Sequence, residues 1–457
     1  MIKPVILWSD ILIFVLVLSV GIFIRLISRN ELSRQRWKKV FRSRIGMAAF
    51  VVVCGYILVA LLDSLHFREP LAPLQEQQHQ ETHYSQELKS ALDVMIGALN
   101  KNEEKTYSEP FALFSFAREN MVDSQGHSYR DFPRLQSAGA AIVDERQQRA
   151  DILLRTGQSL GTAFLLIALM IGAHIAWRRR TAIDGRQPLP WLTAYITLSL
   201  IIIMASWCVW VGSAYHILGT DKVGSDVLYQ SIKAIRTGVL IGTLATILTL
   251  PLAIVLGISA GYFKGWVDDV VQYVYTTLSS IPGILLIAAS VLLIDVYIQT
   301  HQQNFSLSIE RADFKFLALC LILGLTSWTG LCRLLRAETL KVSQLEYIQA
   351  AHAFGVAHHL ILRKHILPNI THIILISLVL DFSGFVLAEA VLSYIGVGVD
   401  PSMHSWGNMI NAARTELSRD PTVWWSVTSA FILMFVLVLA ANLFADRVRD
   451  AFDPRTV

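Results

Sequence analysis

Nine long apolar segments are the feature of this chain that most limits its fold. Their approximate ranges are 4–27, 45–62, 160–177, 190–213, 237–260, 270–297, 314–335, 370–396 and 423–446. A helix needs about 20 predominantly apolar residues to cross a bilayer. Only 16% of the residues are charged, whereas soluble domains carry about 25%. The sequence therefore predicts an all-α polytopic membrane protein with about nine transmembrane helices.

Basic loops predict the orientation of these segments. Residues 25–44, between the first two segments, hold eight Lys/Arg and one Glu, and residues 177–190 are also basic. Short cytoplasmic loops carry an excess of Lys and Arg, so both loops are predicted to lie inside. The amino terminus is then outside, whereas the loop 343–369 and the carboxyl terminus are cytoplasmic. The first segment lacks a small-residue cleavage site and is predicted to be a retained span.

Four regions follow from this count. Residues 1–62 form a transmembrane pair with a basic cytoplasmic loop, and residues 63–158 form a polar extracytoplasmic insertion. Residues 159–213 add two spans, and residues 214–457 form the remaining core. The apolar residues of the insertion recur at helical spacing, and they are Leu88, Leu92, Met95, Ile96 and Leu99. This pattern predicts a small helical domain outside the membrane.

A polar stretch between two apolar segments reads EYIQAAHAFGVAHHLILRKHILPN and covers residues 346–369. It is too polar to cross a bilayer, and it is predicted to form two short helices broken at Gly355 and ended at Pro368. Ser343 and Glu346 have the spacing of a capping box that would start the first helix. Small side chains at Ala350, Ala351 and Ala353 leave room for another backbone. The stretch is therefore predicted to be a socket for a cytosolic protein.

Glycine and proline predict how the spans pack. Gly238 and Gly242, and then Gly257 and Gly261, are spaced four apart, which favours close packing of helices in lipid. Pro251 and the SSIPG turn at 279–283 are predicted to break helices near membrane depth. Such breaks persist where protein or a watery cavity satisfies the freed backbone.

Several chemistries are excluded or disfavoured. A G-x-x-x-x-G-K-[ST] phosphate loop is absent from the sequence, so any ATP hydrolysis must come from another chain. No nucleophile–base grouping is evident, and the chain is predicted not to be an enzyme and to bind no cofactor. The histidines of the 346–369 stretch lack the spacing of a zinc site. The four cysteines lie inside apolar segments and are predicted to be neither disulfides nor metal ligands.

Acidic residues inside spans are costly and usually face a cavity or a partner. Asp381 and Glu389 lie within one predicted span. Asp381 is predicted to face a substrate path and to attract a positive group, such as a peptide amine. Glu389 is predicted to make a structural bond within the bundle, and a place on the substrate path is the alternative. Asp295 lies near the end of a span and is assigned no role.

Four collinear stretches carry a resemblance to a known family. They are His216, Gly219-Thr220-Asp221, Gly224 and Asp226; Gln349-Ala350-Ala351, Gly355 and Leu367-Pro368; EAVLSYIG from Glu389; and Ser405-Trp406-Gly407, Arg449-Asp450 and Asp453-Pro454-Arg455. Over about residues 216–456, the chain resembles the C-type inner-membrane permease subunit of bacterial ABC importers of the oligopeptide/dipeptide/nickel family. The 343–369 loop matches the family's EAA coupling loop, which docks into a groove of the ATPase subunit.

The resemblance implies a function and a set of partners. It implies a type I importer permease that carries peptides across the bacterial inner membrane by alternating access. The implied partners are a second, B-type permease subunit, two ABC ATPase subunits that use the ATP, and an extracytoplasmic solute-binding protein. Lipid surrounds the spans, and no nucleic acid is implied.

The chain departs from the family pattern in three places. Gln349 stands where the coupling loop has an acidic residue, although Glu346 lies one turn away. Ser225 stands where the loop 216–226 commonly has Arg. Residues 72–213 are an insertion relative to the family pattern, and the resemblance implies no role for them. Alternative functions are an importer of nickel or another solute, a receptor sensing a ligand through residues 63–158, and an ion-coupled transporter, which internal repeats would favour.

Overall fold

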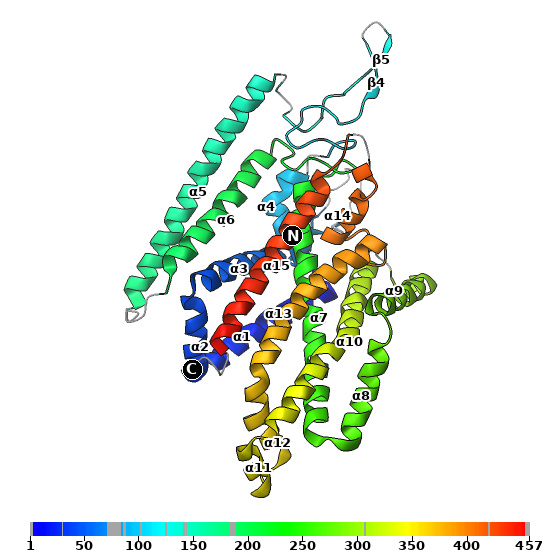
Figure 1. Cartoon of the computed structure of the whole chain (residues 1–457). Helices are drawn as coiled ribbons and strands as arrows, with labels where there is room; N and C mark the ends of the chain where they lie inside the picture. The colour runs from blue at the N-terminus through cyan, green and yellow to red at the C-terminus, as the bar shows by residue number, and fades with distance from the viewer. Residues whose placement is uncertain are drawn as a thin grey trace, which may run out of the picture. The chain divides into compact units, whose positions relative to one another are not determined.

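The structure is a computed structural model in which most of the chain is helical (Figure 1). It describes residues 3–29, 31–70, 84–85, 88–100, 103–123, 126–139, 142, 144–181, 189–305, 308–418 and 421–452. The predicted closing motif at 453–455 and part of the basic loop 177–190 lie outside these residues. The chain divides into two compact units. Unit 1 comprises Met1–Ile13, Met47–Thr237 and His404–Leu437, and unit 2 comprises Phe14–Gly46, Gly238–Met403 and Val438–Val457.

The helices confirm the prediction of a polytopic α-helical membrane protein. Eight helical segments of the described chain are long and apolar enough to span a membrane, which matches eight of the nine predicted segments. They are α3 (Arg44–Asp63), α5 (Glu145–Thr181), α6 (Trp191–Gly212), α7 (Val227–Phe263), α9 (Gly283–Thr300), α10 (Ser308–Val342), the continuous segment His358–Ile395, and α15 (Trp425–Phe452). The ninth, α1 (Trp8–Arg29), has a shorter apolar part at Trp8–Ile22.

The two predicted proline breaks have different outcomes. The SSIPG turn divides the predicted segment 270–297 into α8 (Gly265–Ser279) and α9, because a residue before proline avoids the helical conformation. In contrast, α7 runs through Pro251 without interruption, so that predicted break is wrong. Proline removes a single hydrogen bond from a helix, and the apolar turns on both sides of Pro251 continue to pack against their neighbours in unit 2.

Unit 1 contains the inserted region and the two additional spans. Helices α5 and α6 lie side by side in Figure 1 and pack along their lengths. The region 63–158 is not purely helical as predicted, because its described residues form the helix α4 (Ala91–Asn100), the start of α5 and several short strands. Strands β1 (Lys3–Val5), β2 (His66–Arg68) and β3 (Lys89–Ser90) make an antiparallel sheet. The hairpin of β4 (Glu119–Val122) and β5 (Ser128–Asp131) projects from this region (Figure 1).

Unit 2 contains the remaining core helices. Two of the predicted glycines allow α7 to pack closely on α10. A Cβ on Gly257 would lie 2.7 Å from the carbonyl oxygen of Cys332, and a Cβ on Gly261 would lie 2.7 Å from that of Arg336. Helix α2 (Glu31–Arg42) packs Trp37 and Val40 on the end of α15. The described coupling-loop elements are α11 (Glu346–Ala353), α12 (His358–Ile361), a π-helical turn (Leu362–Ile366) and α13 (Leu367–Ile395). The short helix α14 (Trp406–Ala413) belongs to unit 1.

Candidate functional site: the coupling loop, the 216–226 loop and the membrane acids

The coupling loop is an elbow of two helices at one end of α10 and α13 (Figure 1). Gly355 turns the chain between α11 and α12 with a φ of 73°, a left-handed conformation that favours glycine. A Cβ at this position would meet no atom within 4 Å. The backbone conformation, rather than crowding, therefore requires glycine here, and the predicted break at Gly355 is confirmed.

Two local predictions about this loop are wrong. Ser343 does not cap α11, because its hydroxyl donates to the carbonyl oxygen of Leu340 and the N-cap residue is Leu345. Pro368 does not end the second helix, because the helix continues through it to Ile395. The π-helical turn Leu362–Ile366 comes directly before, and Pro368 occupies the first turn of α13. Proline removes only one hydrogen bond from a helix that continues on both sides of it, so the segment His358–Ile395 is not interrupted.

Apolar contacts fix the inner face of the elbow. Ile348, Ile361 and Ile366 are fully buried in a cluster with residues of α7, α8, α10 and α13. Ala351 packs against the same cluster, so it does not contribute to an open surface as predicted. Burial of three isoleucine side chains stabilises the elbow by several kcal/mol, at roughly 1.5–3 kcal/mol each. The loop is therefore a rigid element of unit 2.

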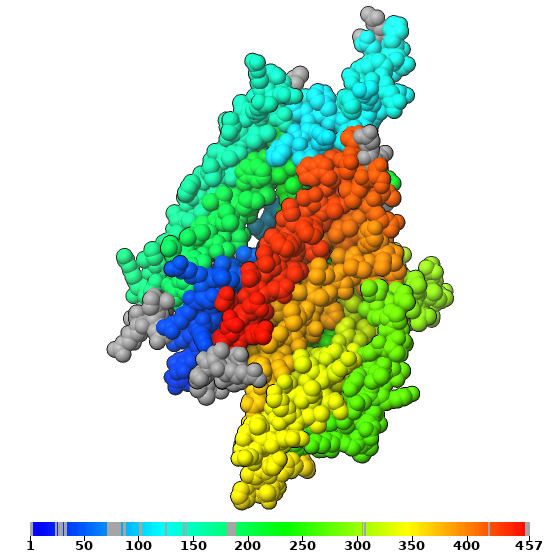
Figure 2. All heavy atoms as spheres, in the orientation of Figure 1, coloured from blue at the N-terminus to red at the C-terminus, as the bar shows by residue number. Residues whose placement is uncertain are grey.

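The outer face of the elbow is exposed and partly apolar. Phe354 at its tip is 87% exposed, and Tyr347 is 48% exposed. Figure 2 shows this yellow segment as an uncovered tip. Glu346 and Gln349 also lie on exposed positions, and the Gln349 amide donates to the carbonyl oxygen of Gln344 at 3.1 Å. Aromatic residues are enriched at protein–protein interfaces, so these two rings favour an interaction surface here.

A contact that the sequence reading missed joins both arms of the elbow. The hydroxyl of Tyr262, near the end of α7, lies 2.8 Å from His352 Nε2 and 2.9 Å from His358 Nδ1. His352 belongs to α11 and His358 to α12. One phenol therefore bridges the two sides of the Gly355 turn. Nothing in the local pattern around Tyr262 signals this contact, because it depends on the path of the chain.

The 216–226 loop connects α6 to α7 and is held by its own side chains. Asp226 accepts the N–H of Tyr229 at 3.0 Å and caps the start of α7. Asp221 accepts the N–H groups of Val223 and Ser225, which closes the turn. His216 is buried, with Nδ1 2.8 Å from Asp226 Oδ2. The loop residues singled out by the sequence thus shape the loop itself.

The inserted region covers this loop directly. The Glu104 N–H donates to the carbonyl oxygen of Gly224 at 3.0 Å, and the Thr220 N–H donates to that of Ser108 at 3.2 Å. A Cβ on Gly224 would lie 1.7 Å from the Glu104 carbonyl oxygen, and one on Gly219 would lie 2.4 Å from that of Ser108. The glycines, both at positive φ, therefore allow the inserted chain to lie against the loop.

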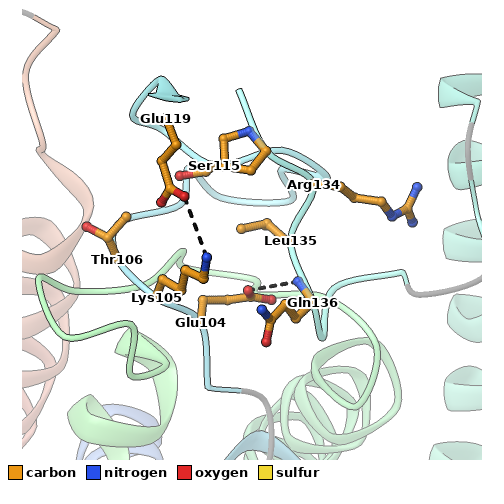
Figure 3. Close-up of a pocket in the computed structure, with 9 residues that line it drawn as sticks. Glu104, Lys105, Thr106, Ser115, Glu119, Arg134, Leu135 and Gln136 are labelled. Carbon is orange, nitrogen blue, oxygen red and sulfur yellow. Dashed lines mark hydrogen bonds and ion pairs between the residues drawn. The ribbon is translucent and has the colours of Figure 1, made fainter. Parts of the chain in front are cut away.

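Glu104 of the inserted region also interacts through its side chain with the buried His216 of the 216–226 loop. Its carboxylate accepts the N–H group of Gln136 at 2.9 Å (Figure 3). It also accepts the N–H group of Ser137 at 2.7 Å and lies 3.8 Å from His216 Nε2. Burial opposes charge on both groups, but the hydrogen bonds and the opposite charges outweigh it. The pKa of Glu104 is lowered, and the pKa of His216 is raised to about 9 by Asp226 and Glu104. His216 is therefore charged at neutral pH.

The two predicted membrane acids have different surroundings in α13. Glu389 is 2% exposed and accepts the Ser393 hydroxyl at 2.7 Å. Asp381 is half-buried, and within the described residues its Oδ2 atom has no hydrogen-bond partner. Leu380, next to Asp381, is 61% exposed. Asp381 thus lies beside a helix face that the described chain leaves uncovered.

Comparisons with known proteins match this chain to transport permeases. Residues 253–457 match the family described as binding-protein-dependent transport system inner membrane component. The oligopeptide transport system permease protein OppC of Mycobacterium bovis is 32% identical over 52% of this chain and 76% of its own length. The glutathione transport system permease protein GsiD of Pectobacterium atrosepticum is 30% identical, over 53% and 74% respectively. The dipeptide permease DppC of Lactococcus lactis is 29% identical, over 52% and 64%.

These matches define the class of protein as a transport permease with several membrane-spanning helices. The chain belongs to the family of inner-membrane permease components of binding-protein-dependent transport systems, and it is a multi-pass inner membrane protein. Among solved structures, the MetNI methionine ABC transporter in an inward-facing conformation gives a TM-score of 0.39 at 14% identity, covering 49% of this chain and 96% of that chain.

Proposed function

We propose that this chain is a permease subunit of an ATP-driven ABC importer that carries peptides or peptide-like solutes across the bacterial inner membrane. The main support is the exposed coupling-loop elbow with Phe354 at its tip, in a chain whose relatives are named as oligopeptide, dipeptide and glutathione permeases. Nickel or another small solute is the alternative cargo. Alternating access requires an element that transmits motion to the spans, and a rigid elbow anchored on α7, α10 and α13 fits that role.

The proposed partners follow from the absence of an ATP-binding phosphate loop in this sequence. ATP is hydrolysed by two ABC ATPase subunits, and this chain itself binds no cofactor. The ATPase docks on the coupling loop, whose proposed contact or shaping residues are Glu346, Gln349, Ala350, Ala351, Gly355, Leu367 and Pro368. A second, B-type permease subunit completes the pore, and a solute-binding protein delivers the cargo from outside.

The proposed orientation rests on the basic loops. Helix α2 carries five Lys/Arg against one Glu, and α5 ends in Arg178, Arg179 and Arg180. With these groups in the cytoplasm, the amino terminus and the 216–226 loop lie outside. The coupling loop and the carboxyl terminus then lie inside, where an ATPase can reach the elbow.

The proposed cargo path includes α13. Asp381 has a buried, unpartnered oxygen among the described residues and lies beside the exposed Leu380. We assign it the role of attracting a positive group of the cargo, whereas Glu389 is buried and acts inside the bundle. An acid at membrane depth is typical of a substrate path.

The test is reconstitution with the native partners. The chain is purified with its neighbouring ATPase, second permease and binding protein, and ATP-dependent uptake of labelled short peptides and of nickel is measured in vesicles. Gly355→Val should abolish ATPase association and uptake, because a β-branched residue is strained at positive φ. Gly355→Asn, which tolerates that conformation, is the matched control and should keep both. A complex that imports nothing, or a Val variant that still couples, contradicts the proposal.

A further inference from the structure

A charged pocket lies in unit 2, and Asp381 is not among the residues that line it. It has a volume of about 160 Å³ and lies between α9, α10 and the segment that follows α13. Its charged lining residues are Asp295, Arg311, Lys315 and Asp400, and its polar lining residues include Gln299 and Gln302. A buried water takes up roughly 30 Å³. The pocket therefore has room for several polar groups at once, such as an ammonium and a carboxylate.

The four charges form two pairs of unequal strength. Lys315 Nζ lies 2.7 Å from Asp295 Oδ1, and the lysine side chain is only 12% exposed. Arg311 Nε lies 3.8 Å from Asp400 Oδ2, and the arginine side chain is 47% exposed. The second contact is too long for a hydrogen bond. The guanidinium of Arg311 is thus in reach of solvent and only weakly engaged by Asp400.

These four charges come from three segments of the chain. Arg311 and Lys315 are four residues apart on α10, so both project from the same face of that helix. Asp295 comes from the neighbouring α9, which packs on α10. Asp400 comes from the segment after α13, where its other oxygen accepts the Ser402 hydroxyl at 2.7 Å. Two cations and two anions therefore converge from separate elements on one small cavity.

We propose that this pocket binds the zwitterionic main-chain ends of a short peptide, with its ammonium on Asp295 and Asp400 and its carboxylate on Lys315 and Arg311. The proposal rests on the proposed function and names a further contact of the same cargo. In the proposed orientation the pocket lies at the outer ends of α9 and α10, where cargo released by the binding protein arrives first. Charge-assisted hydrogen bonds to a carboxylate or an ammonium are the strong ones, and the internal pairs satisfy the site until cargo exchanges with them.

The experiment measures uptake by the complete reconstituted assembly at saturating binding protein. The probes are trialanine, its N-acetylated form and its C-terminally amidated form. Asp295→Asn should lower uptake of trialanine about tenfold, as expected for loss of one charged hydrogen bond, but should change uptake of the acetylated form less than twofold. Arg311→Gln should do the converse, lowering uptake of trialanine while leaving the amidated form unchanged. The binding protein is the same in every assay, so its own preference cancels in the ratio of variant to native chain.

The control breaks an ion pair that joins α10 to another helix at its opposite end. Arg336 Nη2 of α10 donates a hydrogen bond to Asp268 Oδ2 of α8 at 2.7 Å. Asp268→Asn should change uptake of all three probes by the same factor. If Asp295→Asn and Arg311→Gln also act equally on all three probes, the pairs only fasten helices and the proposal is overturned. Arg311 is half-exposed, so its variant is expected to fold even if Asp295→Asn does not. An assembly that carries none of the probes contradicts the proposed function instead.

Discussion

At the residue scale, buried charges in this protein differ in how completely the surrounding chain satisfies them. His216 is enclosed by Asp226 and Glu104, and Glu104 itself accepts N–H groups from the inserted region. Asp381 has no such set of partners among the described residues. His216 Nε2 also lacks a hydrogen-bond partner, but two carboxylates of opposite charge lie close to this ring, whereas an acid at membrane depth without such a partner is typical of a substrate path. The first arrangement therefore holds the fold together, and the second is suited to binding.

Replacing Asp381 with Asn should lower uptake of peptides that carry a free amine by about tenfold, because the attraction for a positive group is lost. Assembly with the partner subunits should not change, since the substitution keeps the size of the side chain. The measurement is ATP-dependent uptake in vesicles. Asp450→Asn, which alters a largely exposed carboxylate on α15, is the control. Equal uptake by the native chain and the Asp381 variant would remove Asp381 from the path.

The pKa of His216 predicts a loss of stability in alkali. Its value in the fold is about 9 against an ordinary value of 6.5, so the stabilisation is fully present below about pH 6.5 and is lost as the pH rises through about 9. The difference corresponds to roughly 3 kcal/mol. Thermal unfolding of the purified chain between pH 6.5 and 9 should show a falling midpoint.

The His216→Gln variant should not show this pH dependence, because the side chain no longer titrates. His301→Gln changes an exposed histidine at the end of α9 and should keep the slope of the native chain. A His216→Gln variant with the native slope would show that other groups cause the loss.

At the scale of elements, the coupling loop combines features that are local with one that is not. The polar stretch between two apolar spans and the glycine at its turn are visible in the sequence, and they predict the elbow correctly. The bridge from Tyr262 to His352 and His358 comes from a helix far away in the chain. Since both arms bond to one hydroxyl, a change in the angle between them must break at least one of these hydrogen bonds.

Tyr262→Phe should weaken coupling between ATP hydrolysis and transport, because it removes both bonds and leaves the ring packing in place. We expect the assembly to hydrolyse ATP but to import several-fold less peptide per ATP. The measurement is the ratio of uptake to hydrolysis in vesicles. Tyr56→Phe removes a comparable hydrogen bond, to the carbonyl oxygen of Leu433 in unit 1, and should leave that ratio unchanged. A native ratio in the Tyr262 variant would exclude the bridge from coupling.

The membrane helices show which structural features the local sequence predicts and which it does not. Hydropathy alone places the spans well, because the requirement for an apolar surface acts on each helix separately. The two prolines show the limit, since the SSIPG turn interrupts a helix whereas Pro251 does not. The outcome at Pro251 depends on the neighbours that pack around that turn of α7, and these are not visible in the residues beside it.

At the scale of the whole molecule, orientation is the property on which the proposed partners depend. If the basic loops are cytoplasmic, the elbow meets the ATPase and the 216–226 loop faces the binding protein. The inserted region covers the 216–226 loop through main-chain hydrogen bonds. In this proposed arrangement a protein that docks on the 216–226 loop also meets the insertion.

Cysteine labelling tests the orientation. In a chain whose four cysteines are replaced, Lys222→Cys should react with a membrane-impermeant thiol reagent from outside, and His359→Cys should react only after the cytoplasmic side is opened. Both positions are exposed, so access depends on the side of the membrane alone. The reverse pattern would place the elbow outside and contradict docking of an ATPase.

The sequence by itself determined the membrane class, the approximate spans and the position of the coupling loop. These are properties of local hydropathy, charge and backbone conformation, and they need no knowledge of distant contacts. The tertiary structure decided which side chains from separate segments meet. Glu104 on His216, Tyr262 between two histidines, and Asp295 with Lys315 beside Asp400 all depend on the path of the chain. A contact between distant segments leaves no periodic pattern in either of them, so only the folded structure reveals it.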